Sequence, residues 1–261
     1  MRTKGLRNKV LKISEGILET VVDVVLLEMA YVGEAATTFS RNTWEPAVKA
    51  DRFLEEINYQ TIKRAIEEAR KKGWLKRTDR RRVWPEITVE GKKRLNSLVP
   101  QYDEKRIWDH RLYLVTYDIP ETRKNDRELL REYLKRIGAG MIQESVWLTP
   151  YNPREVLREF IEERKLRGAI IISDVGKDGS IGEEDIKDLV IRVYRLNEIN
   201  KKYQEFLEKF ADSQAKLWEV ALSYWAILKN DPQLPFELLP SDWLGEKAHQ
   251  LFLKFQAKLN T

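Results

Sequence analysis

The chain has 261 residues, of which 42% are hydrophobic and 10% aromatic, so it can form packed cores in about two domains, and wholesale disorder is excluded. It contains no cysteine, which excludes a disulfide framework, a cysteine zinc site and a cysteine nucleophile. The two histidines, His110 and His249, are far apart in the sequence, so a histidine metal site or serine–histidine catalysis is not expected.

The positive charge lies in the N-terminal part of the chain. Residues 1–100 contain 21 Lys and Arg against 14 Asp and Glu, a net charge of +7, whereas residues 101–261 contain 26 against 28, a net charge of −2. This asymmetry indicates a nucleic-acid-binding module attached to a near-neutral body. No apolar run reaches the roughly 18 residues of a membrane span, and the basic N-terminus has no signal-peptide pattern. We therefore expect a cytoplasmic protein without membrane contact.

Residues 1–100 have the helix pattern of a winged helix-turn-helix domain. Ser14 is expected to cap a first helix that runs to residue 30, and a second helix is expected over residues 45–57. Asn58 is expected to cap a third helix, which Gly73 ends. One face of this third helix is apolar, with Ile62, Ala65, Ile66 and Ala69, and the other is polar, with Gln60, Lys63, Arg64, Glu67 and Lys71.

A hairpin is expected next, with strands over residues 74–77 and 82–88 around a turn at 78–81. The phrase "ITVEGKKRL" then starts another helix. The order helix, helix, helix, hairpin resembles the winged-helix family, including its closing phrase IT-x-x-G-x-x-x-L. Between residues 70 and 82 there are eight basic residues and a single acidic one, Asp79.

The winged-helix reading assigns DNA contacts to particular side chains. The third helix would enter the major groove, where Lys63 and Arg64 suit guanine or phosphate and Gln60 suits adenine. On the wing, arginines would neutralise phosphates and release counterions. The predicted DNA-binding residues are Tyr59, Gln60, Lys63, Arg64, Lys71, Arg77, Arg80, Arg81 and Arg82. The alternatives are a solvated charged surface and a winged helix that binds protein.

Residues 107–178 show the element order β-α-β-β-α-β of a ferredoxin-like domain. A strand over residues 112–117 precedes a helix that Asn125 is expected to cap, and two short strands follow at 141–143 and 145–148. Asn152 is expected to cap the second helix. Gly168 precedes the last strand, residues 169–173.

The text "YLVTYDIPE…LREYLKRIGAGMIQESVW" resembles the small CRISPR-associated ferredoxin-like protein of spacer acquisition, a symmetric dimer with some metal-dependent nucleases among its members. The resemblance implies that Asp118 is the metal ligand and catalytic residue of such a nuclease. The residues themselves also allow another role, because one carboxylate is few for phosphodiester cleavage. Asp118 would then cap the turn or pair with Arg111, Arg123 or Arg127. We expect no metal, no cofactor and no enzymatic activity.

Residues 179–261 are expected to form a helical C-terminal domain. Two strongly helical segments cover residues 183–210 and 211–230, and Asp242 is expected to cap a last helix over residues 244–259. The aromatic and histidine side chains of this region are expected in the core, with pocket lining as the alternative. They are Tyr224, Trp225, Phe236, Trp243 and His249.

The phrase "DPQLPFELLPSDWLGEKAHQLF" resembles the C-terminal signature of the phenylacetic acid catabolism repressor family, the PaaX-like regulators. It departs from the family form at Leu244, where proline is expected. The resemblance spans nearly the whole chain and implies an α+β multidomain regulator of transcription. It implies a homodimeric repressor on double-stranded DNA with a palindromic operator, relieved by a small-molecule inducer of the acyl-coenzyme A type. The alternatives are a metal-dependent nuclease and a non-catalytic DNA-binding protein like those of CRISPR adaptation.

Overall fold

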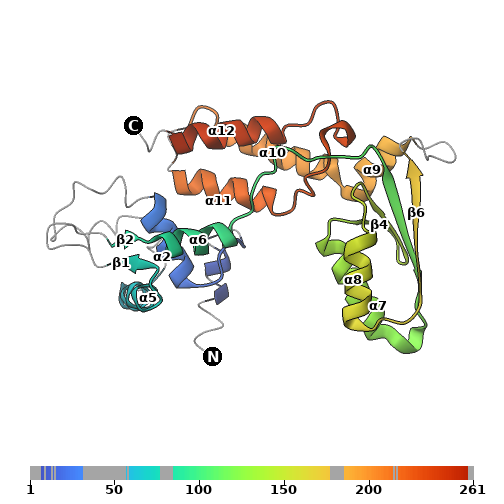
Figure 1. Ribbon diagram of the computed structural model, residues 1–261. Helices are drawn as coiled ribbons and strands as arrows, with labels where there is room; N and C mark the ends of the chain where they lie inside the picture. Colours follow the sequence, from blue (N-terminus) through green and yellow to red (C-terminus); the bar gives the residue numbers. More distant parts are fainter. Residues whose placement is uncertain are drawn as a thin grey trace. The chain divides into compact units, whose positions relative to one another are not determined.

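The computed structural model describes residues 7–31, 57–76, 85–176 and 185–257, apart from positions 9, 13, 15, 58, 214 and 216. The chain is a mixture of helices and strands (Figure 1) and divides into two compact units. The first unit contains residues 1–102, 202–231 and 244–261, and the second contains residues 103–201 and 232–243. None of the described helices is long and apolar enough to cross a membrane. The division into domains 1–100, 107–178 and 179–261 stays a prediction.

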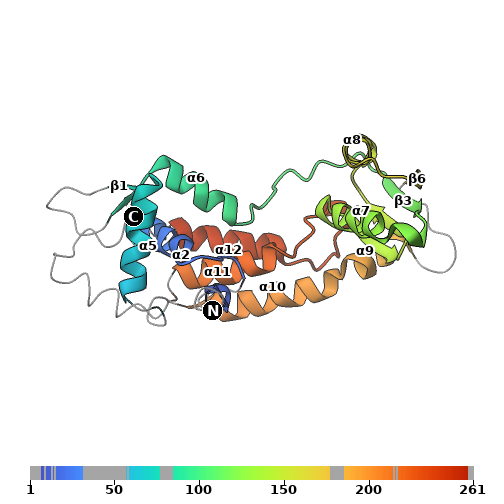
Figure 2. The same cartoon turned by 90° about the horizontal axis from the view of Figure 1, so that it is seen from below.

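The first unit is mainly helical. Its elements are α2 (Val21–Tyr31), α5 (Tyr59–Lys71), β1 (Leu75–Lys76), β2 (Glu86–Ile87), α6 (Val89–Leu98), the greater part of α10 (Leu196–Phe210), α11 (Leu217–Leu228) and α12 (Gly245–Ala257). Helix α2 packs against α5, α6 and α11, and α11 lies beside α12 (Figures 1 and 2). Strands β1 and β2 are antiparallel, with Leu75 opposite Ile87. The predicted second helix, residues 45–57, falls almost wholly outside the described residues.

The prediction that Ser14 caps the first helix is wrong. Ser14 is buried, and its hydroxyl donates to the Val10 carbonyl at 2.8 Å and accepts from the Leu18 N–H at 3.0 Å. Gly16 then adopts a φ of +80°, a left-handed conformation that interrupts a helix. Helix α2 starts only at residue 21, where the Thr20 hydroxyl accepts the Asp23 N–H at 3.1 Å as an N-cap.

Aromatic side chains fill the contact between α11 and α12. The ring of Tyr224 stacks on that of Phe252 with centroids 4.8 Å apart, and its hydroxyl bonds the His249 Nδ1 at 2.9 Å. His249 also stacks on Tyr102, with centroids 4.0 Å apart. The expected core role is therefore seen for Tyr224, Trp225 and His249, which are all buried. The other two residues of that set, Phe236 and Trp243, belong to the second unit, and Phe236 is partly exposed.

The second unit is built on a four-stranded antiparallel sheet in the order β4-β5-β3-β6. Its elements are β3 (Leu112–Asp118), the short helix η1 (Glu121–Arg123), α7 (Lys124–Arg136), β4 (Gly140–Gln143), β5 (Val146–Thr149), α8 (Arg154–Arg164), β6 (Ala169–Gly176), α9 (Ile186–Tyr194), the first residues of α10 and η2 (Phe236–Leu238). The order β-α-β-β-α-β is the one predicted for residues 107–178.

The two faces of this sheet bury different parts of the chain. Helices α7 and α8 cover one face, where Val115, Trp147 and Leu157 are fully buried. On the other face, α9 packs beside the proline-rich segment of residues 232–243, whose Leu234, Leu238 and Leu239 are buried with it. The segment is also held by hydrogen bonds. The Arg106 Nη1 donates to the Leu234 carbonyl at 3.2 Å, and the Tyr151 hydroxyl donates to the Gln233 carbonyl at 3.1 Å.

Several helix boundaries in this half of the chain differ from the predictions. Helix α7 starts at Lys124, directly after η1, so Asn125 lies inside it and caps nothing. Residues 183–210 do not form a single helix, because Arg195 takes a left-handed φ of 55° between α9 and α10. Helix α12 starts at Gly245, and Asp242 accepts hydrogen bonds from Asn200 instead of capping it. Asn152 does accept the Arg154 N–H at the start of α8.

Tyr194 is expected to make the second unit sensitive to alkali. Its hydroxyl donates to the carbonyls of Leu148 at 2.7 Å and Gly138 at 3.1 Å, and burial raises its pKa above the ordinary value despite a hydrogen bond from Gly140. A raised pKa in the folded state means that this contribution is complete below about pH 10 and is lost above it, by about 1.4 kcal/mol per pH unit.

The variant Tyr194→Phe tests this sensitivity. At neutral pH it should be less stable by about 1–2 kcal/mol, because two carbonyls lose their donor. Its free energy of unfolding should nevertheless fall less steeply above about pH 10 than that of the original chain. Denaturant unfolding across this pH range measures both effects, and parallel stability curves would contradict the assignment.

Candidate nucleic-acid interface

Helix α5 separates its residues into one buried and one exposed face. Ile62, Ala65, Ile66 and Ala69 are buried, as the sequence predicted, and helix α2 packs against the same helix. Gln60, Lys63, Arg64 and Lys71 are exposed, whereas Tyr59 at the start of the helix is half-buried. The exposed face therefore has long hydrogen-bonding side chains with three positive charges, on a helix whose position is fixed by an apolar core.

The strand pair after α5 is attached to α6 through Thr88. Its hydroxyl donates to the Gly73 carbonyl at 2.7 Å and accepts the Gly91 N–H at 3.0 Å, and its own N–H donates to the Trp74 carbonyl at 3.0 Å. The phrase IT-x-x-G-x-x-x-L is thus a structural junction. Thr88 caps α6, Gly91 lets that helix approach Trp74, and Leu95 is buried beneath it.

Four of the predicted DNA contacts lie outside the described residues, namely Arg77, Arg80, Arg81 and Arg82. The described strands end on either side of them, at Lys76 and Glu86. Two further exposed cations, Lys92 and Lys93 on α6, follow the capped junction directly, and sequence reasoning did not include them. Their signal was available, because both belong to the basic run that follows Thr88.

A buried ion pair connects α2 to α6 behind the exposed face. Asp23 is only 1% exposed, and its carboxylate accepts from the Arg94 Nε at 3.2 Å, the Arg94 Nη2 at 3.1 Å and the Thr20 hydroxyl at 2.7 Å. The Arg94 guanidinium also lies over the ring of Trp74, 5.6 Å from its centroid. Sequence reasoning missed this pair, because 71 residues separate its members and neither belongs to a recognised motif.

Removing Arg94 should expose the cost of burying Asp23. The variant Arg94→Met keeps most of the aliphatic stem but leaves a buried carboxylate without its cation, so we expect a loss of about 1–3 kcal/mol in the free energy of unfolding. The double variant Asp23→Asn with Arg94→Met should be more stable than Arg94→Met alone, since no charge is left unpaired. A double-mutant cycle by chemical denaturation measures the coupling, and strictly additive losses would refute it.

Asp118, the candidate metal ligand, lies at the end of β3 opposite Ala169 and is exposed. Within the described part of the chain, no side chain or backbone group bonds or pairs with its carboxylate, so the predicted capping role is wrong. The three arginines considered as its partners pair elsewhere. Arg111 pairs with Asp174, Arg123 with Asp126 at 3.1 Å, and Arg127 with Glu144 at 3.7 Å.

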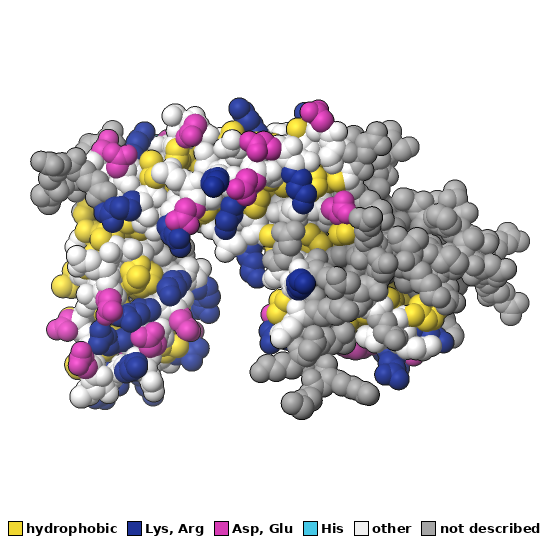
Figure 3. Space-filling model, turned by 180° about the vertical axis from the view of Figure 1, so that it is seen from behind, with side chains coloured by type: hydrophobic (Ala, Val, Ile, Leu, Met, Phe, Trp, Pro, Cys, Tyr) yellow, Lys and Arg dark blue, Asp and Glu magenta, His cyan; other side chains and the backbone are white. Residues whose placement is uncertain are grey.

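Acidic and basic groups are balanced on the second unit. In Figure 3 its basic side chains, at the lower left, lie among acidic ones. Arg131 pairs with Glu128 at 3.0 Å and with Glu144 at 2.9 Å. The Gly176 N–H and the Arg111 guanidinium hold the pKa of Asp174 below its usual value. Among the described residues, no three acidic or histidine side chains are placed to share a metal ion.

Comparisons with known proteins identify the chain. Residues 105–186 match the domain described as "PaaX protein central Cas2-like domain", and residues 194–261 match the "PaaX-like protein C-terminal domain". These two matches define the class as DNA-binding transcriptional regulators rather than enzymes. Because together they cover more than half of the chain, the protein belongs to the PaaX-like family, with a central Cas2-like domain.

A solved structure extends the likeness to residues that the family matches do not reach. The uncharacterized protein Rv0674 from Mycobacterium tuberculosis aligns over 91% of this chain and 93% of its own length, with a TM-score of 0.54 and 17% identity. At that identity the likeness concerns the fold alone. No curated protein matched the chain in the comparison made.

Proposed function

We propose that this protein is a homodimeric transcriptional repressor that binds a palindromic DNA operator through an N-terminal winged helix and is released by a small-molecule inducer. The observation that supports it most is α5, an amphipathic helix with buried Ile62 and Ile66 and exposed Gln60, Lys63 and Arg64. A strand pair and a capped helix follow α5 in the order of a winged helix. The protein would act in the cytoplasm, where its DNA is.

In this proposal α5 is the recognition helix. Lys63 and Arg64 would donate hydrogen bonds to guanine O6 and N7 or to phosphates, and Gln60 would pair with adenine. Arg77, Arg80, Arg81 and Arg82 of the wing, with Tyr59 and Lys71, would position the module on the backbone. Binding would release counterions from the DNA, so the affinity should fall steeply as the salt concentration rises.

Strand β6 supports dimerisation through the ferredoxin-like central region. It has eight residues and pairs with β3 along one side, and no other described strand pairs with its second side. Ile171 on this strand is 59% exposed. A long, isoleucine-rich edge strand is a template for pairing with another chain. Twofold pairing of two copies would place two recognition helices on half-sites about one helical turn apart, or a multiple of that.

The variant Ile171→Lys tests that interface. A charge on the edge strand should convert the dimer into a monomer, and operator affinity should fall at the same protein concentration because each half-site is then bound separately. Met141→Lys on β4 is the matched control, since Met141 is also exposed but lies on the opposite edge of the sheet. Light scattering measures the mass, and a dimer unaffected by Ile171→Lys would contradict this interface.

Selection from a pool of random duplexes tests the repressor proposal. The full-length protein should enrich one sequence with twofold symmetry, and footprinting should protect both half-sites. An inducer would act by linkage, because a ligand that binds the DNA-free form more tightly lowers operator affinity by the same factor. A pool with no enriched sequence would favour the non-catalytic CRISPR-adaptation-like protein instead.

The second candidate is a metal-dependent nuclease. The observation in its favour is the exposed carboxylate of Asp118 at a strand end, in a Cas2-like domain. Incubation of the purified protein with DNA and Mg²⁺ or Mn²⁺ separates the two candidates. The repressor proposal predicts no cutting, and operator affinity unchanged in Asp118→Ala. Cutting that Asp118→Ala abolishes would establish the nuclease.

A further inference from the structure

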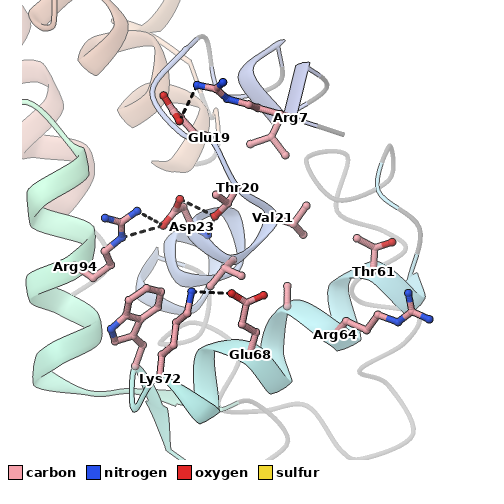
Figure 4. Close-up of a pocket in the computed structure, with 14 residues that line it drawn as sticks. Arg7, Glu19, Thr20, Val21, Asp23, Thr61, Arg64, Glu68, Lys72 and Arg94 are labelled. Carbon is pink, nitrogen blue, oxygen red and sulfur yellow. Dashed lines mark hydrogen bonds and ion pairs between the residues drawn. The ribbon is translucent and has the colours of Figure 1, made fainter. Parts of the chain in front are cut away.

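A cavity of about 480 Å³ lies in the first unit, bounded by α2, α5, α6 and the turn before β1 (Figure 4). Its apolar wall contains Val10, Val21, Val22, Ala65 and Trp74. From α5 it receives Thr61, Arg64, Glu68 and Lys72, whereas Gln60 and Lys63 do not line it. The cavity therefore adjoins the candidate DNA-reading helix along a stripe next to the one that contains Lys63.

The charges around the cavity are nearly all paired. Arg7 pairs with Glu19 at 2.9 Å, Lys72 with Glu68 at 2.7 Å, and Arg94 with Asp23 at 3.1 Å. Figure 4 shows these three pairs along the wall. The remaining cation of the lining, Arg64, has no carboxylate partner among the described residues. The cavity therefore offers one positive charge that is not neutralised locally, beside an apolar surface.

This arrangement defines a class of ligand. Cavities of about 300–1,000 Å³ hold small molecules, and apolar walls with a few polar groups bind their hydrophobic parts. A single free guanidinium suits one carboxylate, sulfonate or similar anion. A polyanion such as a nucleoside triphosphate is disfavoured, because the lining contains three carboxylates, Glu19, Asp23 and Glu68.

We propose that this cavity is an effector site for a small, mainly apolar molecule with a single negative charge, and that its occupancy weakens DNA binding by engaging Arg64. The regulatory part rests on the proposed function. A bound anion would pair with a guanidinium that DNA phosphates or bases otherwise use. Ligand and DNA then compete for one positive charge, and by linkage each lowers the affinity of the other by the same factor.

The dye 1-anilinonaphthalene-8-sulfonate is a suitable probe, because it is apolar, has one sulfonate and fluoresces in apolar surroundings. We expect it to bind the full-length protein at one site. Arg64→Met should weaken this binding about tenfold or more, the loss of one charge-assisted hydrogen bond. Val22→Phe, which fills the cavity from α2, should abolish it. Lys63→Met removes the neighbouring exposed cation, which is not part of the lining, and should leave dye affinity unchanged.

Thermal unfolding checks that each variant is folded. If Val22→Phe fails to fold, Thr61→Phe at a half-buried position of the same wall replaces it. Dye affinity that is equal in the original chain, Arg64→Met and the filled variant would overturn the site.

DNA binding separates the site from its regulatory role. With the original chain, saturating dye should lower the affinity for a selected duplex about tenfold, the effect of losing one contact. With Val22→Phe, duplex binding should persist and become insensitive to the dye. Dye bound in the cavity without any effect on duplex affinity would refute the regulation. Failure of every duplex to bind, with dye binding intact, would refute the proposed function and leave the site standing.

Discussion

Replacing Lys63 and Arg64 together by alanine is expected to weaken binding to the operator about a hundredfold or more. Both side chains are exposed on α5, and each contact to a base or a phosphate is worth about 1–3 kcal/mol. If both residues contact phosphates, the slope of log affinity against log salt should also fall in magnitude by about two. Fold stability should change little, because neither side chain is buried.

The matched control removes two charges from another exposed helix surface. Lys201→Ala with Lys202→Ala changes the net charge by the same amount on α10, where both side chains are exposed. Fluorescence anisotropy with a labelled duplex across a salt series measures affinity and slope in one experiment. Equal losses in the two double variants would mean that only the overall charge matters, and α5 would not be the recognition helix.

Gly91→Ala is expected to destabilise the first unit by about 2–4 kcal/mol. An added Cβ at residue 91 would lie 2.3 Å from the Trp74 carbonyl oxygen and 2.8 Å from the Ile87 Cγ1, so α6 would have to move away from the strand pair. That movement would strain the hydrogen bond from the Gly91 N–H to the Thr88 hydroxyl, which caps the helix.

This expectation runs against helix propensity, which favours alanine over glycine inside a helix by about 1 kcal/mol. The two effects therefore predict opposite signs, which makes the variant informative. Glu90→Ala is the control, since the neighbouring residue is exposed on the same helix. Urea unfolding followed by tryptophan fluorescence gives both free energies. A Gly91→Ala protein as stable as the original would show that α6 does not pack on Trp74 in this way.

Local sequence patterns predicted the elements whose stability is local. Helix α5 followed from the spacing of Ile62, Ala65, Ile66 and Ala69, and all four are buried. The sheet of the second unit followed from short apolar strands separated by amphipathic helices. Helix starts were predicted less well, because a capping residue in the sequence does not show whether the chain before it can continue the helix. Ser14 and Asn125 both failed for that reason.

Features that depend on distant contacts were not predictable in this way. Arg195 adopts a left-handed φ that arginine does not favour, so the break between α9 and α10 has no local signal. The phrase "LPFELLP" was recognised as a signature, but its packing on the central sheet through Leu234, Leu238 and Leu239 is a tertiary contact.

The candidate site shows the same division. The exposure of Gln60, Lys63 and Arg64 could be read from the helical period. The pair Asp23–Arg94 and the cavity beside it could not, because they bring together α2, α5 and α6. Asp118 was singled out by its place after a strand, and the structure leaves its carboxylate exposed to solvent.

The central claim is sequence-specific DNA recognition by this chain, and its most direct test is the affinity of the full-length protein for a selected duplex and for the same bases in scrambled order. At moderate salt the selected duplex should bind at least about a thousandfold more tightly. Binding to both duplexes should weaken as salt rises. Equal affinity for the two duplexes at every salt concentration, or no binding to either, would contradict the account.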